Sequence, residues 1–352
     1  MNFKSPLLWV LIFSIVAAIL RFWNLGFQMM NNDEIWTINF VPVSMTVWQC
    51  LIHSLSTDYN PPLYYLLAHF SMVVFGETAT AIRIPSAIAG VLLVPVMYYL
   101  GREYRDELFG LLLSGLTTFF YILVFYSRYG RAYSVAILFF TIAFIYFLRL
   151  VKGDARASVP FGIFALLCLW THLFTVIPLG VMVLYLLWSR KAYTGIAMMV
   201  IGALPLLNYI PLVLATRSIE AAYIEQNFGF SWWQLILLVP TDLFGYSVIF
   251  LFPILLWALW KYRSDLVIRL ITAIFAATWL SMIVLSFETP IIMHYSLWCL
   301  PILLIPLLLP VHNAFLSRKV PFTYFCIGMV VVLLESLQIV WLLNQQRISM
   351  AI

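Results

Sequence analysis

The sequence predicts an all-α polytopic membrane protein of 352 residues, and three observations support this fold class. The chain is 64% hydrophobic and only 9% charged, whereas a soluble domain is nearer half apolar and a quarter charged. Its mean hydropathy is +1.02. Its 13 tryptophans, 19 tyrosines and 28 phenylalanines are typical of a chain that anchors many helix ends at a membrane interface. The net charge of +5 is modest and indicates cytoplasmic anchoring of loops rather than nucleic-acid binding.

The apolar runs give the expected membrane spans. A span needs about 20 apolar residues, because about 30 Å of hydrocarbon is crossed at roughly 1.5 Å per residue. Eleven spans are predicted, at 6–27, 80–101, 108–126, 132–150, 159–171, 172–189, 194–215, 233–260, 265–285, 294–310 and 320–343. The first run is long for a signal-peptide core and lacks an A-x-A cleavage site, so we expect it to remain as the first span.

Lysine and arginine residues predict the orientation of these spans, because cytoplasmic loops are enriched in both. With the N-terminus inside, most of the 19 basic residues fall in cytoplasmic connections. The exceptions, on the outer side or at outer helix ends, are Arg21, Arg83, Arg128, Arg131, Arg217 and Arg347. This bias favours eleven crossings, with the N-terminus inside and the C-terminus outside.

The run 160–188 carries no formal charge, yet both of its flanks are basic. One helix of this length would measure roughly 44 Å, which is too long for a single crossing. Basic flanks on one side also require an even number of crossings. We therefore predict two short helices divided near Thr171-His172, with His172 at the outer turn. Broken helices at membrane depth usually border a cavity.

The outer loop 28–79 is the second irregular region. Residues 35–57 carry no formal charge and show apolar side chains at helical spacing, which predicts a helix lying in the membrane interface. A second interfacial helix is expected over 61–75, opened by Pro61-Pro62. A crossing hairpin stays open as an alternative, because it leaves the number of crossings unchanged.

The whole chain, 1–352, is expected to form one transmembrane domain without a soluble domain. Residues 1–215 would be the catalytic module, containing the outer loop, and 216–352 a set of more variable helices. The four cysteines show no C-x-x-C spacing, so neither a disulfide nor a cysteine metal site is predicted.

Five short motifs follow one another along the first part of the chain. They are Asp33-Glu34, the sequence DYNPPLYY from Asp58 to Tyr65, the sequence IRIPSA from Ile82 to Ala87, Gly101-Arg102 and Arg131-Ala132-Tyr133. In this order they resemble polyprenyl-phosphate-dependent glycosyltransferases of the GT-C fold, of the superfamily of protein mannosyltransferases and aminoarabinose transferases (glycosyltransferase families 39 and 83). Thr171 to Phe174 and His294-Tyr295 extend the resemblance, which is weaker over the last 180 residues.

The chemistry of such a transfer needs few groups. The phosphate of a polyprenyl-phosphate sugar leaves readily, so one base that takes the acceptor proton is enough. Charge that builds on the departing phosphate needs fixed cations, for which arginine is suited. Direct displacement inverts the anomeric centre. The expected partners are a polyprenyl-phosphate sugar donor, a glycan, lipid or protein acceptor, and membrane lipids.

Asp33 is the residue that we expect to act as this base, and the resemblance implies the same role. The alternative is a solvated acidic pair at the positive end of the following helix. For Glu34 the capping role and a functional role stay equally open.

The DYNPPLYY motif supplies the residues predicted to support the acceptor side of the site. Asp58 either orients the acceptor or assists a metal ion, or it caps the helix that begins at Pro61. Asn60 stands where the family often has histidine, which weakens any phosphate or metal role at this position. Tyr64 is included as site support.

Basic and aromatic residues at the outer helix ends are predicted to bind the donor phosphate. They are Arg128, Arg131, Tyr133, His172, His294 and Tyr295. The resemblance implies this role for Arg131 with Tyr133, and the alternative for both arginines is snorkelling to the interface. A lone histidine is more often a satisfied polar residue at a helix end. No metal ligands are assigned, although a divalent metal ion remains an open option.

The sequence thus predicts an inverting glycosyltransferase in the plasma membrane of a bacterium or archaeon, with its active site on the outer face. Two alternatives stay open, a flippase for lipid-linked saccharides and a non-catalytic partner subunit of a transferase. A flippase needs polar residues at several membrane depths, whereas here they cluster at outer ends. A partner subunit would tolerate the loss of Asp33.

Overall fold

The computed structural model describes residues 5–58, 60–212, 232–287 and 293–317, together with positions 334, 337, 338, 340 and 341. These residues form helices and their connections, without a strand among them. The α-helices are α1 (Pro6–Phe22), α2 (Asn32–Phe40), α3 (Val47–Thr57), α4 (Pro62–Phe75), α5 (Ala79–Tyr104), α6 (Glu107–Phe119), α7 (Tyr121–Ser127), α8 (Tyr133–Val151), α9 (Ser158–Thr171), α10 (Val176–Trp188), α11 (Tyr193–Ala203), α13 (Trp232–Phe244), α14 (Val248–Lys261), α15 (Leu266–Leu285) and α16 (Leu300–Leu316). The 3₁₀ helix η5 (Met293–Cys299) precedes α16.

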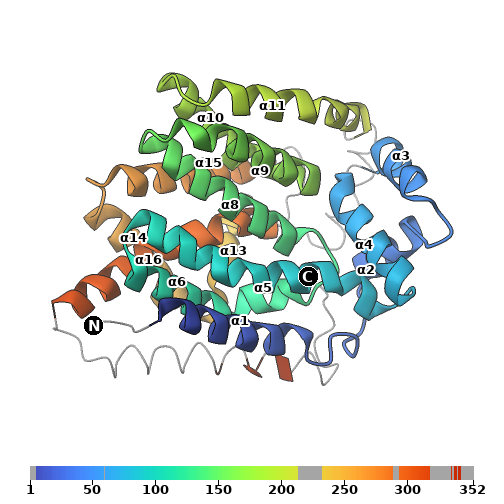
Figure 1. Cartoon of the computed structure of the whole chain (residues 1–352), viewed down its shortest axis with the longest axis horizontal. Helices are drawn as coiled ribbons and strands as arrows, with labels where there is room; N and C mark the ends of the chain where they lie inside the picture. The colour runs from blue at the N-terminus through green and yellow to red at the C-terminus, as the bar shows by residue number, and fades with distance from the viewer. Residues whose placement is uncertain are drawn as a thin grey trace.

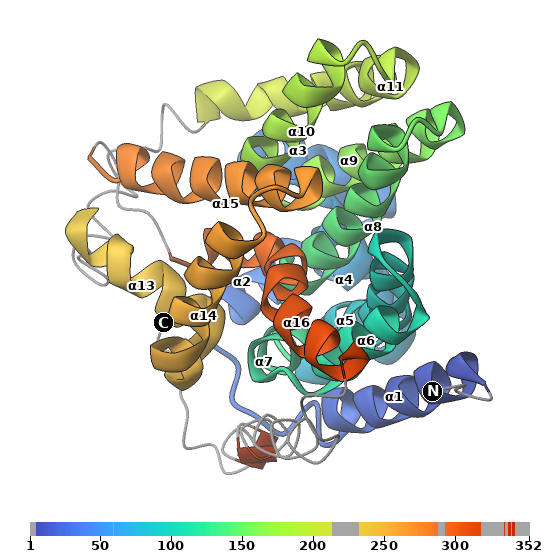
Figure 2. The ribbon, with the colours of Figure 1, turned by 90° about the vertical axis from the view of Figure 1, so that its left-hand side faces the viewer.

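Most long helices run side by side in one bundle, and α2, α3 and α4 gather at one end of it (Figure 1). We call this end the loop end. Helix α5 lies in the middle of the N-terminal half and packs against α1, α4, α6 and α8. Figure 2 shows α15 alongside α10, and α14 beside α16. The first half of the chain therefore builds a continuous core around α5 and α8, onto which the later helices pack.

The membrane character of the sequence is reflected in these helices. Among the described residues, five helices are long and apolar enough to cross a membrane, or up to seven if each bent pair counts as one span. Every predicted span except 320–343 coincides with a helical segment. That last span lies, apart from a few positions, outside the described residues. The all-α class is confirmed, and the total of eleven crossings stays a prediction, as does the boundary at residue 215.

Two predicted spans are bent pairs of helices rather than single helices. The span 108–126 consists of α6 and α7, which meet at an angle of 58°. The span 233–260 consists of α13 and α14, which meet at 99°. The second bend includes Gly245, whose φ of 51° lies in the left-handed region that favours glycine. Each bent pair can still count as one membrane span, so both predicted spans stay predictions.

The loop end contains three helices where two were predicted, because 35–57 is divided into α2 and α3. Pro42 lies in the gap and lacks the N–H group that a continuing helix needs. Thr46 then opens α3 with a capping box, in which its side chain accepts from the Gln49 amide and Gln49 bonds back to the Thr46 amide. The sequence thus ends one helix and starts the next.

The predicted break near Thr171-His172 is confirmed. Helix α9 ends at Thr171, His172 has an extended backbone, and α10 begins at Val176 after a single 3₁₀ turn. The Lys191 ammonium group, just beyond α10, donates hydrogen bonds to the last carbonyl groups of α8. The His172 ring lies 5.7 Å from the ring of Tyr133, at the opposite end of α8. The chain therefore runs to the loop end and back, with His172 at its turning point.

Two buried arginines connect α1 with the bend between α6 and α7, and each one binds backbone carbonyl groups of the other segment. Arg21 of α1 donates to the carbonyl oxygens of Thr117 and Thr118, which lie in the last turn of α6, where helical carbonyls have no intrahelical donor. Arg128, which follows α7, donates to the end of α1, at the carbonyl oxygens of Leu20, Arg21, Trp23 and Asn24. Each arginine thus completes the hydrogen bonding of the other segment's helix end.

Gly90 of α5 has no side chain, which allows Arg21 and Ser127 to pack closely against α5. A Cβ atom there would stand 2.4 Å from Cβ of Ser127 and 2.7 Å from Nε of Arg21. We expect Gly90→Ala to destabilise the protein by about 1–3 kcal/mol, the usual cost of overpacking, seen as a lower midpoint of thermal unfolding in detergent. Gly180→Ala in α10 is the control, because nothing lies within 4 Å of its Cβ position. Equal midpoints for both variants would contradict this close packing.

Candidate active site

The acidic pair at the start of α2 has one buried and one exposed member. Glu34 is fully buried and forms a two-pronged ion pair with Arg83 of α5, with Nη2–Oε2 at 2.6 Å and Nε–Oε1 at 2.7 Å. The Gly130 amide also donates to Oε1, at 2.7 Å. Asn31 and Glu34 form a capping box that opens α2. Glu34 thus takes part in capping α2, but it is buried rather than solvated, and its predicted functional role stays a prediction.

Asp33 lies on the exposed side of the first turn of α2. The Tyr129 hydroxyl donates to its Oδ2 at 3.1 Å and in turn accepts from the Asn31 side chain. Burial, and then the negative charge of Asp33, raise the pKa of Tyr129, so its phenol stays protonated and available as a donor. An exposed carboxylate oriented by this hydrogen bond retains lone pairs for an acceptor proton, as a general base requires.

Arg131 lies in the turn before α8, between the surroundings of Asp33 and those of Asp58. Its Nη1 donates to Oγ1 of Thr37 at 3.3 Å, one turn after Asp33 on α2. It is close enough for its charge to act on Asp33 and on Tyr65. Its carbonyl oxygen accepts from the hydroxyl of Ser86 at 2.9 Å, which ties the turn to α5. A half-buried cation is thereby held close to the exposed carboxylate of Asp33.

Asp58 ends α3 and is buried, with 6% of its surface exposed. The Tyr65 hydroxyl donates to its Oδ2 at 2.5 Å, and the Asn60 amide donates to both oxygens at 3.2 and 3.3 Å. The N-cap residue of α4 is Pro61, which makes no side-chain cap bond, and the capping alternative for Asp58 stays open. Tyr64 bonds instead to α5, where its hydroxyl donates to the Ile82 carbonyl at 2.8 Å. Tyr65, rather than Tyr64, contacts the motif's carboxylate.

Seven aromatic side chains, including Tyr129, pack together at the loop end, and we call them the aromatic cluster. They are Tyr126, Tyr129, Tyr133, His172, His294, Tyr295 and Trp298. Tyr129 stacks on Tyr133 with ring centroids 6.1 Å apart. The ring of Tyr133 lies 4.8 Å from that of His294. Four residues predicted to bind the donor phosphate, Tyr133, His172, His294 and Tyr295, are thus brought together from three segments.

Several polar atoms of the aromatic cluster are buried without a hydrogen-bond partner in the part of the chain that the structure describes. They are Nδ1 of His172, Nδ1 of His294 and Nε1 of Trp298. Leaving such an atom unpaired costs about 1–3 kcal/mol, so native proteins rarely do so without water or a ligand. Their concentration in one cluster next to Asp33 and Arg131 makes this cluster a candidate place for water or a polar ligand.

Arg128 does not join this cluster. Its side chain is fully buried and its guanidinium group donates to the carbonyl oxygens at the end of α1. A donor phosphate at Arg131 would have to displace this cap to reach Arg128. We therefore do not include Arg128 in the proposed site.

No three histidine, cysteine, aspartate or glutamate side chains of the described residues are grouped so that they could hold a metal ion. Residues 5–58, 60–212, 232–287 and 293–317 thus offer no set of metal ligands to assign. The option of a divalent metal ion at Asp58 stays a prediction, and we build no step on it.

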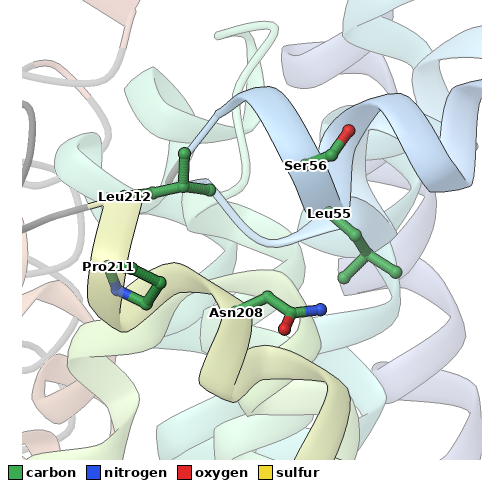
Figure 3. Close-up of a pocket in the computed structure, with 5 residues that line it drawn as sticks. All are labelled: Leu55, Ser56, Asn208, Pro211 and Leu212. Carbon is green, nitrogen blue, oxygen red and sulfur yellow. The ribbon is translucent and has the colours of Figure 1, made fainter.

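A pocket of about 350 Å³ lies between the end of α3 and the end of the segment Tyr193–Leu212 (Figure 3). Its lining is mostly apolar and comprises Leu55, Ser56, Asn208, Pro211 and Leu212. Tyr209 links this region to the Asp58 motif, because its hydroxyl bonds to the carbonyl oxygens of Ser54 and Asn60. No charged residue lines this pocket, so we do not include it in the candidate site.

Three contact residues of the site had no predicted role, namely Tyr65, Tyr129 and Asp242. Asp242 of α13 accepts a hydrogen bond from Tyr126 at 3.2 Å. A signal for Asp242 was present, because an acidic residue in an apolar membrane helix usually has a function. Tyrosines at helix ends are common interface anchors, so Tyr65 and Tyr129 could not be distinguished from the others.

Comparisons with known proteins bear on the fold. Residues 59–214 match the sequence model described as dolichyl-phosphate-mannose-protein mannosyltransferase. No curated protein sequence matches the chain. Solved structures of ArnT from Cupriavidus metallidurans are similar in fold. The apo form has a TM-score of 0.63 at 17% identity, covering 92% of this chain and 63% of ArnT. The form bound to undecaprenyl phosphate has a TM-score of 0.63 at 18% identity, covering 93% and 64%.

The oligosaccharyltransferase AglB from Archaeoglobus fulgidus, solved with an inhibitory peptide and a dolichol-phosphate, is also similar. Its TM-score is 0.58 at 14% identity, covering 99% of this chain and 56% of AglB. The chain thus spans less than two thirds of the length of these proteins. Its resemblance to GT-C proteins of the mannosyltransferase and aminoarabinose transferase type, inferred from the motifs, is confirmed at the level of the fold.

Proposed function

We propose that the chain is an inverting glycosyltransferase that moves a sugar from a polyprenyl-phosphate donor to an acceptor on the outer face of the membrane. The observation that carries this proposal is the meeting of Asp33, Tyr129 and Arg131 at the loop end, beside the aromatic cluster. The match over residues 59–214 supports a glycosyl-transfer activity. The undecaprenyl phosphate bound in the ArnT structure and the dolichol-phosphate in the AglB structure support the donor class.

The proposed reaction is a single displacement. An acceptor hydroxyl group donates its proton to the exposed carboxylate of Asp33, and its oxygen attacks the anomeric carbon of the donor sugar. The bond from that carbon to the phosphate oxygen breaks, and its electron pair leaves with polyprenyl phosphate. Attack from the face opposite to the phosphate inverts the anomeric configuration. The products are the glycosylated acceptor and polyprenyl phosphate, and Asp33 then returns its proton to water.

Each neighbouring residue has a defined task in this proposal. Arg131 holds the phosphate and stabilises the charge that develops on it, because a guanidinium group suits a phosphate geometrically and electrostatically. Tyr129 orients Asp33 through its hydroxyl group. Glu34 and Arg83 keep α2 and the turn before α8 in register, so that base and cation stay at a fixed separation.

The test is transfer of radiolabelled sugar from a panel of polyprenyl-phosphate sugars in membranes with and without the protein. We expect transfer from at least one donor, an inverted anomeric configuration in the product, and loss of transfer in Asp33→Asn. Retained configuration would refute the single displacement. If Asp33→Asn transfers as well as the wild type, Asp33 is not the base. If the wild type moves labelled donor across the bilayer but transfers none, the flippase alternative replaces the enzyme.

Arg131→Gln should weaken the binding of a bare polyprenyl phosphate. A charge-assisted hydrogen bond contributes about 1.5–3 kcal/mol, so the dissociation constant should rise by about 10- to 100-fold. Binding is measured on the purified protein in nanodiscs, and the wild-type affinity should fall with added salt. Arg156→Gln is the matched control, because Arg156 is exposed and lies beyond the far end of α8. An equal loss in both variants would argue against a specific phosphate site at Arg131.

A further inference from the structure

Asp242 is a half-buried acidic residue, with one carboxylate oxygen fully buried, that the proposed reaction does not use. It lies in the last turn of the apolar helix α13. Acidic residues in membrane helices are costly and normally face the bundle interior or a water-filled cavity. The Tyr126 hydroxyl donates to Oδ1 of Asp242 at 3.2 Å. Its other oxygen, Oδ2, is buried and accepts no hydrogen bond from the described residues.

Tyr126 connects Asp242 to the aromatic cluster. The Tyr126 ring lies 5.3 Å from that of Tyr133 and 6.1 Å from that of His294. Helix α13 packs against η5, the 3₁₀ helix that carries His294 and Trp298. Asp33 reaches the same cluster through Tyr129, whose ring lies 6.4 Å from that of Tyr126. The cluster is therefore flanked by two carboxylates on different helices, α2 and α13.

The unpaired atoms of this region indicate what kind of ligand would fit. Trp298 offers an N–H donor, the two histidines offer a donor or an acceptor each, and Asp242 offers an acceptor. A lipid chain would leave all of these atoms unpaired. A phosphate group would be repelled by the carboxylate. A sugar carries several groups that both donate and accept hydrogen bonds, and its ring can pack against aromatic side chains.

We propose that Asp242 binds the sugar of the donor by accepting a hydrogen bond from a sugar hydroxyl or ammonium group, while the phosphate lies at Arg131. This inference rests on the proposed function. The sugar would then lie on the aromatic cluster between the two carboxylates, with its anomeric carbon towards Asp33. Asp242 would thus select among donors that share one lipid phosphate but carry different sugars.

The test measures binding to the purified protein in nanodiscs for three ligands: bare polyprenyl phosphate, polyprenyl-phosphate mannose and polyprenyl-phosphate aminoarabinose. In Asp242→Asn, the Tyr126 hydroxyl still pairs with the side-chain oxygen, so the NH₂ group takes the place of Oδ2. The NH₂ group of the asparagine side chain, a hydrogen-bond donor, then faces the hydroxyl or ammonium group of the sugar, which would donate a hydrogen bond to the wild-type carboxylate. We expect the affinity for the preferred sugar-bearing ligand to fall by about 10- to 100-fold, and that for bare polyprenyl phosphate to stay within about twofold. A larger loss for aminoarabinose than for mannose would identify an ammonium group as the partner.

Asp265→Asn is the matched control. Asp265 also accepts from a tyrosine, the Tyr104 hydroxyl at 2.9 Å, but it lies at the end of the bundle opposite to the loop end and caps α15. Asparagine caps a helix about as well as aspartate, so this variant should bind all three ligands as the wild type does. If Asp242→Asn does not fold, Tyr126→Phe replaces it. That variant releases the orienting hydrogen bond and should lose about three- to tenfold affinity for the sugar-bearing ligand alone.

Other outcomes overturn the proposal. A parallel loss for the bare and the sugar-bearing ligands would make Asp242 a structural residue. Unchanged binding of all ligands, or a wild type that binds no sugar-bearing ligand more tightly than the bare phosphate, would exclude a sugar site there. Selective binding by a wild type that transfers nothing would remove the proposed reaction and leave the sugar site standing.

Discussion

Asp33→Asn is expected to lower the rate of sugar transfer by about 10²- to 10⁴-fold, the usual contribution of a positioned general base. Asparagine keeps the shape of the side chain and can still accept the hydrogen bond from Tyr129, but it cannot take a proton. The carboxylate is exposed, so its replacement removes no buried interaction. The midpoint of thermal unfolding should therefore equal that of the wild type, and donor binding should persist. The measurement is the initial rate of transfer with the best donor of the panel.

Glu77→Gln provides the matched control for this experiment. Glu77 is another exposed carboxylate at the loop end, and its Oε1 accepts from the Val43 amide at 2.7 Å. Glutamine retains that acceptor, so the variant should transfer at the wild-type rate. A similar loss in Glu77→Gln and Asp33→Asn would trace the effect to loop charge rather than to a base. A low rate in Asp33→Asn together with a lowered unfolding midpoint would also contradict the assignment.

Glu34→Gln is expected to cause the largest loss of stability, about 3–5 kcal/mol, the usual effect of breaking a buried ion pair. Each Glu34 oxygen accepts two hydrogen bonds, Oε1 from Arg83 Nε and Gly130 N, and Oε2 from Arg83 Nη2 and Asn31 N. Glutamine must place an NH₂ group against two of these donors. It also leaves the buried guanidinium group of Arg83 without a counter-charge. The midpoint of thermal unfolding and the yield of folded protein both report this loss.

The control is Glu103→Gln at the other end of the bundle. Glu103 pairs with Arg149 and Lys152, whose side chains are 41% and 48% exposed. Exposed ion pairs contribute about 0–1 kcal/mol, because water and salt screen them. Substitutions at the adjacent residues Asp33 and Glu34 are thus predicted to have different effects: Asp33→Asn lowers the rate of transfer, and Glu34→Gln lowers the stability of the fold. Unfolding midpoints that match for Glu34→Gln and Glu103→Gln would refute the structural role of Glu34.

Much of the fold can be predicted from the lengths of the apolar runs and the positions of the basic residues. The division at His172 is predictable because helix length and the positions of basic residues leave no other arrangement of 160–188. The bend between α6 and α7 is not, because neither glycine nor proline marks it. There Arg21 of another helix binds the carbonyl groups at the end of α6. Such a partner is visible only once the helices are packed.

The candidate site shows the same limit at the level of single side chains. Tyr64 and Tyr65 belong to one motif, but neighbouring helical residues point about 100° apart, and only packing decides which contacts Asp58. Arg128 and Arg131 stand three residues apart in one turn. The end of α1 binds the first, so the second remains near Asp33. The roles of Asp33, Arg131, Tyr133, His172, His294 and Tyr295 in catalysis stay predictions.

The exchange of arginines between α1 and the α6–α7 bend constrains how the chain is made. The partners of Arg21 lie 96 and 97 residues further along the chain, so α1 emerges from the ribosome long before they are synthesised. Until then its guanidinium group must stay near the lipid headgroups, because an unpaired arginine in hydrocarbon is costly. Helix α1 therefore takes its final depth only when α6 and α7 arrive. We therefore expect these three segments to insert as one unit, although α2, α3, α4 and α5 separate α1 from α6 in the order of synthesis.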